Sequence, residues 1–177
     1  MSLKLVLLDR DGVINRQIKG GYVNALEDFV VNLGVYDLLK FLDSVKIRTA
    51  IVTNQQGLGK GETNFLDFFL IQGTFAQECV RRGIMPPQLF YCPHIEGTCE
   101  CRKPKLGLLL AAMSTFGVSP DECLLIGDSV SDTASAIQLQ MPSLHFIAGN
   151  ACDSTCPALS HPRDFIEMTK KLHDLIL

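Results

Sequence analysis

Residues 5–12 read LVLLDRDG, a short apolar run that ends abruptly in two acids and a glycine. Such a run is typical of a buried strand, and Gly12 permits a tight turn directly after it. In open α/β sheets, ligands bind just beyond the carboxyl ends of the strands. Asp9 and Asp11 therefore stand where a binding site is expected, although a plain polar turn after a core strand has the same local pattern.

The same succession of an apolar run and then polar groups recurs along the chain. Further strands are predicted at residues 48–52, 88–91, 123–126 and 144–147. Polar side chains follow three of them: Thr53 and Asn54, then Arg102 and Lys103, then Asp128 and Asp132. Asp132 is also placed to cap the helix that follows it. Because the ends of parallel strands share one edge, these groups are expected to form a single site with Asp9 and Asp11.

Helical periodicity fills the segments between the strands. It predicts helices over residues 35–44, 65–82, 106–116 and 163–175, and one through Ile137 and Leu139. In the helix over residues 65–82, five apolar residues are expected to face the core: Phe65, Phe68, Phe69, Phe75 and Val80. Residues 15–34 are predicted to be a long loop, and residues 57–61 a mobile rim loop that carries Lys60.

This alternation of strands and helices predicts an α/β fold, a doubly wound parallel sheet with right-handed crossovers. About forty to fifty residues separate successive polar clusters, and the predicted elements fill them, which leaves no room for a cap domain. We therefore expect residues 1–177 to form a single domain with an open site.

A compact group of metal-ligating residues follows the third predicted strand, at Cys92, His94, Cys99 and Cys101. Three thiolates and an imidazole are the soft ligands that Zn²⁺ prefers, and four protein ligands close its tetrahedron. Such a zinc ion is structural and would pin the loop. Scattered buried thiols are the alternative, but buried cysteines rarely gather around a histidine. The ligands are too closely spaced to frame the recognition helix of a zinc finger.

Composition narrows the class of protein. A net charge of −3 gives no electrostatic reason to expect nucleic acid or an anionic membrane as a partner. The chain has no apolar run long enough to span a bilayer, and its first residues lack the layout of a signal peptide. The seven cysteines are odd in number and three of them lie beside a histidine, which favours a reduced, cytoplasmic protein over a disulfide framework. We expect a monomer, and the roles of Cys152 and Cys156 stay open.

The residue types at the shared strand edge are those of phosphoryl chemistry. Asp9, Asp128 and a main-chain carbonyl near Asp11 are oxygen ligands suited to Mg²⁺. The Thr53 hydroxyl, the Asn54 N–H and the Lys103 ammonium are donors suited to a phosphoryl group. Asp9 is placed to attack phosphorus as a carboxylate nucleophile. Asp11 is placed to protonate the leaving group and then to activate water.

Four of these segments, taken in order, resemble the motifs of the haloacid dehalogenase (HAD) superfamily of aspartyl-phosphate hydrolases. They are Asp9 to Gly12, Thr53 to Gln55, Lys103, and Gly127-Asp128 with Asp132. The run from Tyr91 to Pro104 resembles the zinc-loop branch, which contains D-glycero-D-manno-heptose 1,7-bisphosphate 7-phosphatases and histidinol-phosphate phosphatases. The resemblance implies Asp9 as nucleophile, Asp11 as general acid and base, and Mg²⁺ held by Asp9, Asp11 and Asp128. It also implies Thr53 and Lys103 as phosphate binders and Arg102 reaching towards the substrate.

The resemblance implies a phosphatase of carbohydrate metabolism that acts on a small phosphorylated metabolite, with heptose bisphosphate as the favoured substrate. Gly21-Tyr22-Val23 is similar to the heptose enzymes. The four-residue gap after His94 and the Gly57-Leu58-Gly59 stretch favour histidinol phosphate, and Ser129 stands where a heptose enzyme has a basic residue. Specificity is expected to come from residues 15–24, residues 55–61 and the zinc loop. The alternatives are a histidinol-phosphate phosphatase, a phosphotransferase and a non-catalytic binding module of the same fold.

Overall fold

A five-stranded parallel sheet forms the centre of the protein. The structure is a computed structural model, and it describes residues 3–146, 169 and 172. The strands are β1 (Leu5–Leu8), β2 (Arg48–Asn54), β3 (Gln88–Cys92), β4 (Cys123–Gly127) and β5 (Ser143–His145). They lie in the order β3-β2-β1-β4-β5, and every pair of neighbours is parallel. This order confirms the predicted doubly wound α/β sheet.

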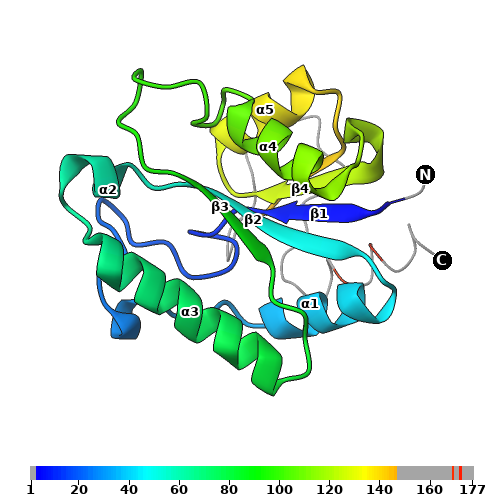
Figure 1. Ribbon diagram of the computed structural model, residues 1–177, viewed down its shortest axis with the longest axis horizontal. Coiled ribbons are helices and arrows are strands. Elements are labelled where there is room, and N and C mark those ends of the chain that lie inside the picture. Colours follow the sequence, from blue (N-terminus) through cyan, green and yellow to red (C-terminus); the bar gives the residue numbers. More distant parts are fainter. Residues whose placement is uncertain (1–2, 147–168, 170–171, 173–177) are drawn as a thin grey trace.

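Helices cover both faces of the sheet. They are α1 (Val35–Ser44), α2 (Gln56–Lys60), α3 (Phe65–Arg81), α4 (Gly107–Phe116) and α5 (Val130–Gln138), with short 3₁₀ turns η1 (Leu26–Asp28) and η2 (Pro120–Glu122). Figure 1 shows α1 and α3 on one face and α4 and α5 on the other. Within the described part of the chain, no helix is both long and apolar enough to cross a bilayer.

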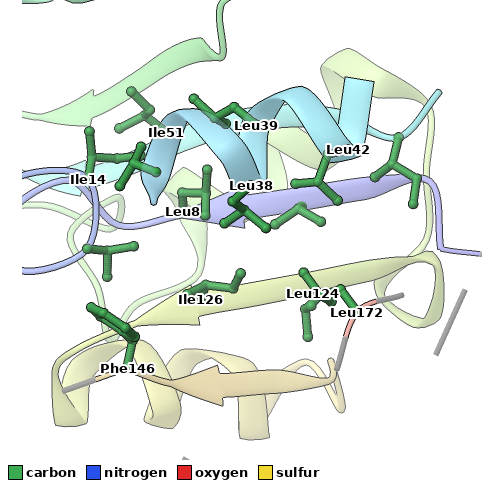
Figure 2. Packing of buried hydrophobic residues seen from close by; sticks show 14 of the residues in the cluster. Leu8, Ile14, Leu38, Leu39, Leu42, Ile51, Leu124, Ile126, Phe146 and Leu172 are labelled. Atoms are coloured by element: carbon green, nitrogen blue, oxygen red, sulfur yellow. The ribbon is translucent and has the colours of Figure 1, made fainter. Parts of the chain in front are cut away.

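The central strand is buried on both faces because each of its side chains joins one of two hydrophobic clusters. Val6 and Leu8 pack with α1 and α3 in the cluster drawn in Figure 2. Leu5 and Leu7 pack with α4 and α5 in the other cluster. All four side chains are 0% exposed, which explains why the strand reads as a continuous apolar run rather than an alternating one.

The register of the sheet sets the place of the polar residues. Leu8 lies beside Ile51 of β2 and Ile126 of β4. The chain therefore leaves β1 at Asp9 level with Gly127, the last residue of β4, while β2 continues to Asn54. In β3, Cys92 lies beside Asn54. One edge of the sheet thus collects the residues that follow four different strands, as the sequence predicts.

One prediction about α3 is wrong. Phe65, Phe69 and Val80 were expected to face the core, but they are 46%, 47% and 63% exposed. The buried stripe is Phe68, Ile71, Gln72, Phe75 and Cys79. Since a residue adds about 100° to the helical turn, the stripe that begins at Phe68 places the three exposed side chains on its flank.

The prediction of a mobile rim loop at residues 57–61 is also wrong. These residues belong to the short helix α2 and its end, and Gly57 and Leu58 are buried. A Cβ on Gly57 would lie 2.6 Å from Oγ1 of Thr63, and one on Gly59 would lie 2.4 Å from the Pro93 carbonyl oxygen. The glycines therefore serve close packing, which overrides their poor helix propensity.

Several predictions concern the end of the chain. The fifth strand was predicted at residues 144–147 and is observed at Ser143–His145, with residue 147 outside the described part. The loop with Cys152 and Cys156 and most of the closing helix at residues 163–175 also lie outside the described residues. Thr169 and Leu172 are described and are helical, and Leu172 is fully buried in the core cluster of Figure 2.

Candidate active site

Asp9 lies at the centre of the strand edge. Its main-chain N–H continues the sheet by donating to the Ile126 carbonyl at 2.8 Å. Its Oδ1 accepts a hydrogen bond from the main-chain N–H of Arg10 at 2.8 Å. The side chain is thus fixed by its own turn, and at 9% exposure little of it faces solvent.

Lys103 reaches the same point from the loop after β3. Its Nζ lies 3.1 Å from Oδ1 of Asp9 and 2.5 Å from Oδ1 of Asp132, and it donates to the Val52 carbonyl at 2.7 Å. The residue is almost fully buried. Burial by itself acts to lower the pKa of Lys103, but the carboxylates of Asp9 and Asp132 outweigh it and raise that pKa. The side chain is therefore a buried ammonium ion held between acids.

Asn54 fixes the main chain of Lys103. Its side-chain amide donates to the Lys103 carbonyl at 2.9 Å and accepts from the Lys103 N–H at 3.0 Å. This pair of hydrogen bonds joins the end of β2 to the loop after β3. The sequence predicted Asn54 as a phosphate donor through its main-chain N–H, and it did not predict this contact of the side chain.

Three carboxylates converge beside Lys103. One oxygen each from Asp9, Asp128 and Asp132 lies within 4.8 Å of the others. Burial, reinforced by the neighbouring acids and opposed by Lys103, raises the pKa of Asp9 to about 7; the pKa of Asp128 is raised to about 7 in the same way. One ammonium does not offset three acids, so this excess of buried negative charge and hard oxygen ligands fits a divalent cation such as Mg²⁺.

Asp132 contacts both the N-cap residue of α5 and Lys103. It is the third residue of α5, and its carboxylate accepts from the N–H and hydroxyl of Ser129, the N-cap residue. Asp132 therefore completes a capping box while its other oxygen contacts Lys103. These hydrogen bonds between Ser129 and Asp132 fix the start of α5.

Asp11 is held apart from the three clustered carboxylates. Gln55 donates to its Oδ2 at 2.7 Å, and Asn15 donates to its Oδ1 at 3.0 Å. Arg10 lies 3.4 Å from Oδ1 with a guanidinium that is 1% exposed and that contacts the rings of Phe29 and Phe68. Three donors thus fix the direction of the Asp11 carboxylate. Sequence reasoning missed Asn15 and the Gln55 side chain, because only burial in the fold distinguishes them from loop residues.

Two further residues predicted to bind substrate lie at this edge. The Thr53 hydroxyl is buried and accepts from the Gln55 side chain at 2.9 Å. Arg102 has a buried Nη1 without a hydrogen-bond partner among the described residues. A buried donor without a partner is costly, and a bound anion would satisfy it.

The predicted zinc ligands come together as a cluster. The sulfur of Cys101 lies 3.1 Å from that of Cys92 and 3.4 Å from that of Cys99, and 3.1 Å from Nδ1 of His94. Disulfide sulfurs lie about 2.05 Å apart. Ligands at about 2.3 Å from one zinc ion lie about 3.8 Å from each other. The sulfurs are too far apart for a disulfide, and the four ligand atoms are close enough together to share one metal ion.

The cluster is joined directly to the loop that carries Lys103 to the strand edge. The N–H of Arg102, the residue before Lys103, donates to the Cys99 sulfur at 3.4 Å. Burial opposes ionisation of Cys99, but this N–H and the neighbouring thiols Cys101 and Cys92 lower its pKa to about 6. A thiolate at neutral pH is the form that binds zinc. An ion bound here would hold Arg102 and Lys103 in place.

Comparison with known proteins gives relatives over most of the chain. A HAD-hydrolase-like family model matches residues 100–174. A D-glycero-alpha-D-manno-heptose-1,7-bisphosphate 7-phosphatase from Campylobacter jejuni is 36% identical over 144 residues, which are 81% of this chain and 82% of that protein. A D-glycero-beta-D-manno-heptose-1,7-bisphosphate 7-phosphatase from Helicobacter pylori is 32% identical and covers 78% of this chain and 80% of its own.

Solved structures show the same fold. A D,D-heptose 1,7-bisphosphate phosphatase from B. bronchiseptica, solved with magnesium and phosphate, superposes with a TM-score of 0.88 at 23% identity, over 98% of this chain and 99% of that one. The corresponding protein from Burkholderia thailandensis superposes with a TM-score of 0.72 at 19% identity, over 96% and 98% of the two chains.

Proposed function

The chain belongs to the HAD-like phosphatase family of the heptose-1,7-bisphosphate 7-phosphatases, and from this premise we propose that it hydrolyses the 7-phosphate of D-glycero-D-manno-heptose 1,7-bisphosphate. The observation that carries the proposal is the convergence of Asp9, Lys103 and Asp128 at one sheet edge in a chain with these relatives. The relatives favour this substrate over histidinol phosphate, in agreement with the prediction from Gly21-Tyr22-Val23.

The proposed reaction begins with attack by Asp9. One of its carboxylate oxygens forms a bond to phosphorus as the bond to the sugar oxygen breaks, which gives an aspartyl-phosphate and an alkoxide. Lys103, 3.1 Å from Asp9, reduces the repulsion between the carboxylate and the phosphate dianion. The Thr53 hydroxyl and the unpartnered Nη1 of Arg102 are further donors for the phosphoryl oxygens or the sugar.

Asp11 is proposed to move the protons. It gives a proton to the leaving alkoxide and then takes one from the water that hydrolyses the aspartyl-phosphate. The three donors around Asp11 suit this role, because they hold the carboxylate in one orientation for both steps. The second step releases inorganic phosphate and restores Asp9.

We propose that Asp9, Asp128 and the main chain at Asp11 hold Mg²⁺, and that Cys92, His94, Cys99 and Cys101 hold a structural Zn²⁺. A magnesium ion, when bound, neutralises charge on the phosphoryl group. The proposal for Mg²⁺ rests on the three converging carboxylates, and that for Zn²⁺ on the separations of the four zinc ligands.

The test is phosphate release in the presence of Mg²⁺ from a panel of esters. The panel contains both anomers of the heptose bisphosphate, histidinol phosphate and simple sugar monophosphates. We expect one heptose anomer to exceed every other ester in kcat/KM by at least about 100-fold, which is about 2.7 kcal/mol of transition-state binding. Faster hydrolysis of histidinol phosphate, or equal slow hydrolysis of all esters, would contradict the proposal. Transfer of the phosphoryl group to an added alcohol in preference to water would identify a phosphotransferase.

A further inference from the structure

An exposed apolar surface runs along α3. Phe65, Phe69 and Val80, which the sequence predicts to face the core, lie at the surface instead. Leu66 and Leu70 lie there too, at 79% and 57% exposure. Figure 1 shows α3 along the outside of the molecule. Single exposed apolar side chains are ordinary, but a contiguous group of them marks an interaction surface.

These apolar side chains form one stripe centred on Gly73, the middle residue of α3. Each residue turns the helix by about 100°, so Leu66 and Val80 lie about 20° to either side of Gly73. Phe69 lies about 40° from that line and Leu70 about 60°. We call this surface the α3 stripe, and it comprises Phe65, Leu66, Phe69, Leu70, Gly73 and Val80.

The described packing of the chain gives no reason for a glycine at position 73. A Cβ built on Gly73 would meet no described atom within 4 Å. The residue lies inside a regular helix and does not have the positive φ that favours glycine. Glycine is a poor helix former, so its presence at an open helical position weakens α3 without a gain inside the chain. A glycine does allow a second main chain to approach closely.

The α3 stripe is complementary to itself when two copies lie antiparallel with Gly73 opposite Gly73. A twofold axis at this point places each residue level with the one equally far beyond position 73 in the other copy. Leu66 of one copy then lies level with Val80 of the other, and Leu70 with Ala76. Beside Val80 the surface has a recess of about 400 Å³ that can receive the side chain of Leu66. It is lined by Ala76, Gln77, Val80, Arg81 and Pro86.

The charges at the two ends of α3 match in the same arrangement. Asp67 lies in the first turn of the helix and Arg81 in the last. They lie about 120° and about 80° from Gly73 on the same side of the stripe, and about 9 Å and about 12 Å from it in opposite directions along the axis. Antiparallel packing therefore brings Asp67 of each copy beside Arg81 of the other. A parallel pair would place like charges together. Among the described residues, Arg81 pairs with Glu78 of its own helix and Asp67 forms no ion pair.

From this self-complementarity we infer that the α3 stripe is the interface of a homodimer, in which the α3 helices of two chains pack antiparallel across Gly73. The dimer replaces the monomer expected from the sequence, because the apolar pattern of α3 does not reveal which of its side chains stay exposed in one chain. A helix of 17 residues is about 25 Å long, and one pair of such helices covers less than the roughly 800 Å² per partner of a standard interface. We therefore expect a dimer that dissociates on dilution.

The first test is sedimentation velocity of the full chain over about 1 to about 200 µM, where the mass should rise from one chain to two. Leu66→Glu is expected to raise the Kd of the dimer at least about 30-fold, because it places a carboxylate against the apolar recess. Leu33→Glu is the matched control, since Leu33 is 89% exposed and lies outside α3. It should keep the wild-type Kd.

Charge exchange tests the antiparallel arrangement. Asp67→Arg and Arg81→Asp are each expected to raise the Kd about tenfold, because each dimer contains the pair twice. The double variant Asp67→Arg/Arg81→Asp restores opposite charges and should return to within about threefold of the wild-type Kd. Unrelated damage to α3 would add in the double variant instead.

Gly73→Gln separates the needs of the helix from those of the interface. Glutamine is a better helix former than glycine and has open space here, so the melting midpoint of the dilute monomer should rise. The dimer should weaken at least about 30-fold, because two glutamines would meet at the twofold axis.

Three outcomes would overturn the inference. They are a wild-type protein that stays monomeric at about 200 µM, an unchanged Kd in folded Leu66→Glu, and a charge-exchange double variant weaker than both single variants. Circular dichroism establishes that each variant is folded. A monomer at every concentration would mean that the stripe serves a different protein or none. The α3 stripe contains none of the proposed catalytic residues, so these measurements stand whichever ester the protein hydrolyses.

Discussion

Asp128 approaches the main chain at Gly12 so closely that a Cβ on residue 12 would lie 1.8 Å from Oδ2 of Asp128. Gly12 also has a φ of +94°, which side chains disfavour. Asp128, directly after β4, can therefore pack against the turn after β1 only because residue 12 has no Cβ. This contact lets Asp128 and Asp9 join one carboxylate cluster.

Gly12→Ala is expected to lower kcat/KM for phosphate release by at least about 100-fold, because Asp128 must move by more than an ångström. Gly83→Ala is the matched control, since Gly83 has a φ of +70° and open space around its Cβ position. The control carries only the backbone strain, about 1–2 kcal/mol, and should retain activity. Equal activity in the two variants would show that the contact with Asp128 is unimportant.

Asp9→Asn is expected to lower phosphate release by at least about 1,000-fold, because an amide cannot form the aspartyl-phosphate. The fold should persist, since Lys103 keeps Asp132 and the Val52 carbonyl as partners. Steady-state rates and circular dichroism check both expectations. Near-normal turnover in a folded variant would rule out covalent catalysis by Asp9.

Lys103→Met is expected to destabilise the protein by about 3 kcal/mol in the absence of Mg²⁺, because it leaves buried carboxylates without their cation. Lys105→Met is the matched control, since the Lys105 ammonium is exposed and contacts the exposed Glu100 carboxylate and the Cys99 carbonyl. Urea unfolding measures both, and the control should match wild type. A Lys103→Met protein as stable as wild type would contradict the described ion pairs.

Protein purified without chelator is expected to hold about one zinc ion per chain, because one set of four ligands is present. Cys99→Ser should lose the zinc, lower the melting midpoint by at least about 5 °C, and lower kcat, since Cys99 contacts the N–H before Lys103. Cys79→Ala, a core cysteine outside the cluster, should keep the zinc. Elemental analysis decides, and stable, fully active Cys99→Ser without zinc would refute a structural role.

The strands and helices of the sheet are predicted well because each depends on a pattern of apolar residues within its own segment. β1 is predicted and observed at residues 5–8, and α1 at residues 35–44, since apolar runs and helical spacing follow directly from what each segment buries. The convergence of the polar clusters follows from the parallel order, as the 3.1 Å contact between Lys103 and Asp9 illustrates.

The failures involve contacts between distant segments. Gly57 and Gly59 read as loop residues, because their reason for being glycine is the packing against Tyr22 and Pro93. Asn54 reads as a phosphate donor, whereas its side chain also holds the main chain of Lys103, which is 49 residues away. Periodicity carries no information about such partners. The sequence therefore predicts the residues that carry the chemistry of the site but not the contacts that hold them in position.

The acids of the site predict a pH dependence of stability whose sign is set by burial. Asp9 and Asp128 have pKa values raised to about 7, above the value near 3.9 of an unfolded aspartate. The folded protein then binds protons that the unfolded chain releases between about pH 4 and pH 7, so stability falls as pH rises through that window.

Without Mg²⁺, the melting midpoint should be lower at about pH 8 than at about pH 6. Adding Mg²⁺ should raise it most at the higher pH, because the cation binds the ionised carboxylates. Asp9→Asn should show a shallower slope, and a slope equal to that of wild type would mean that Asp9 does not titrate in this range.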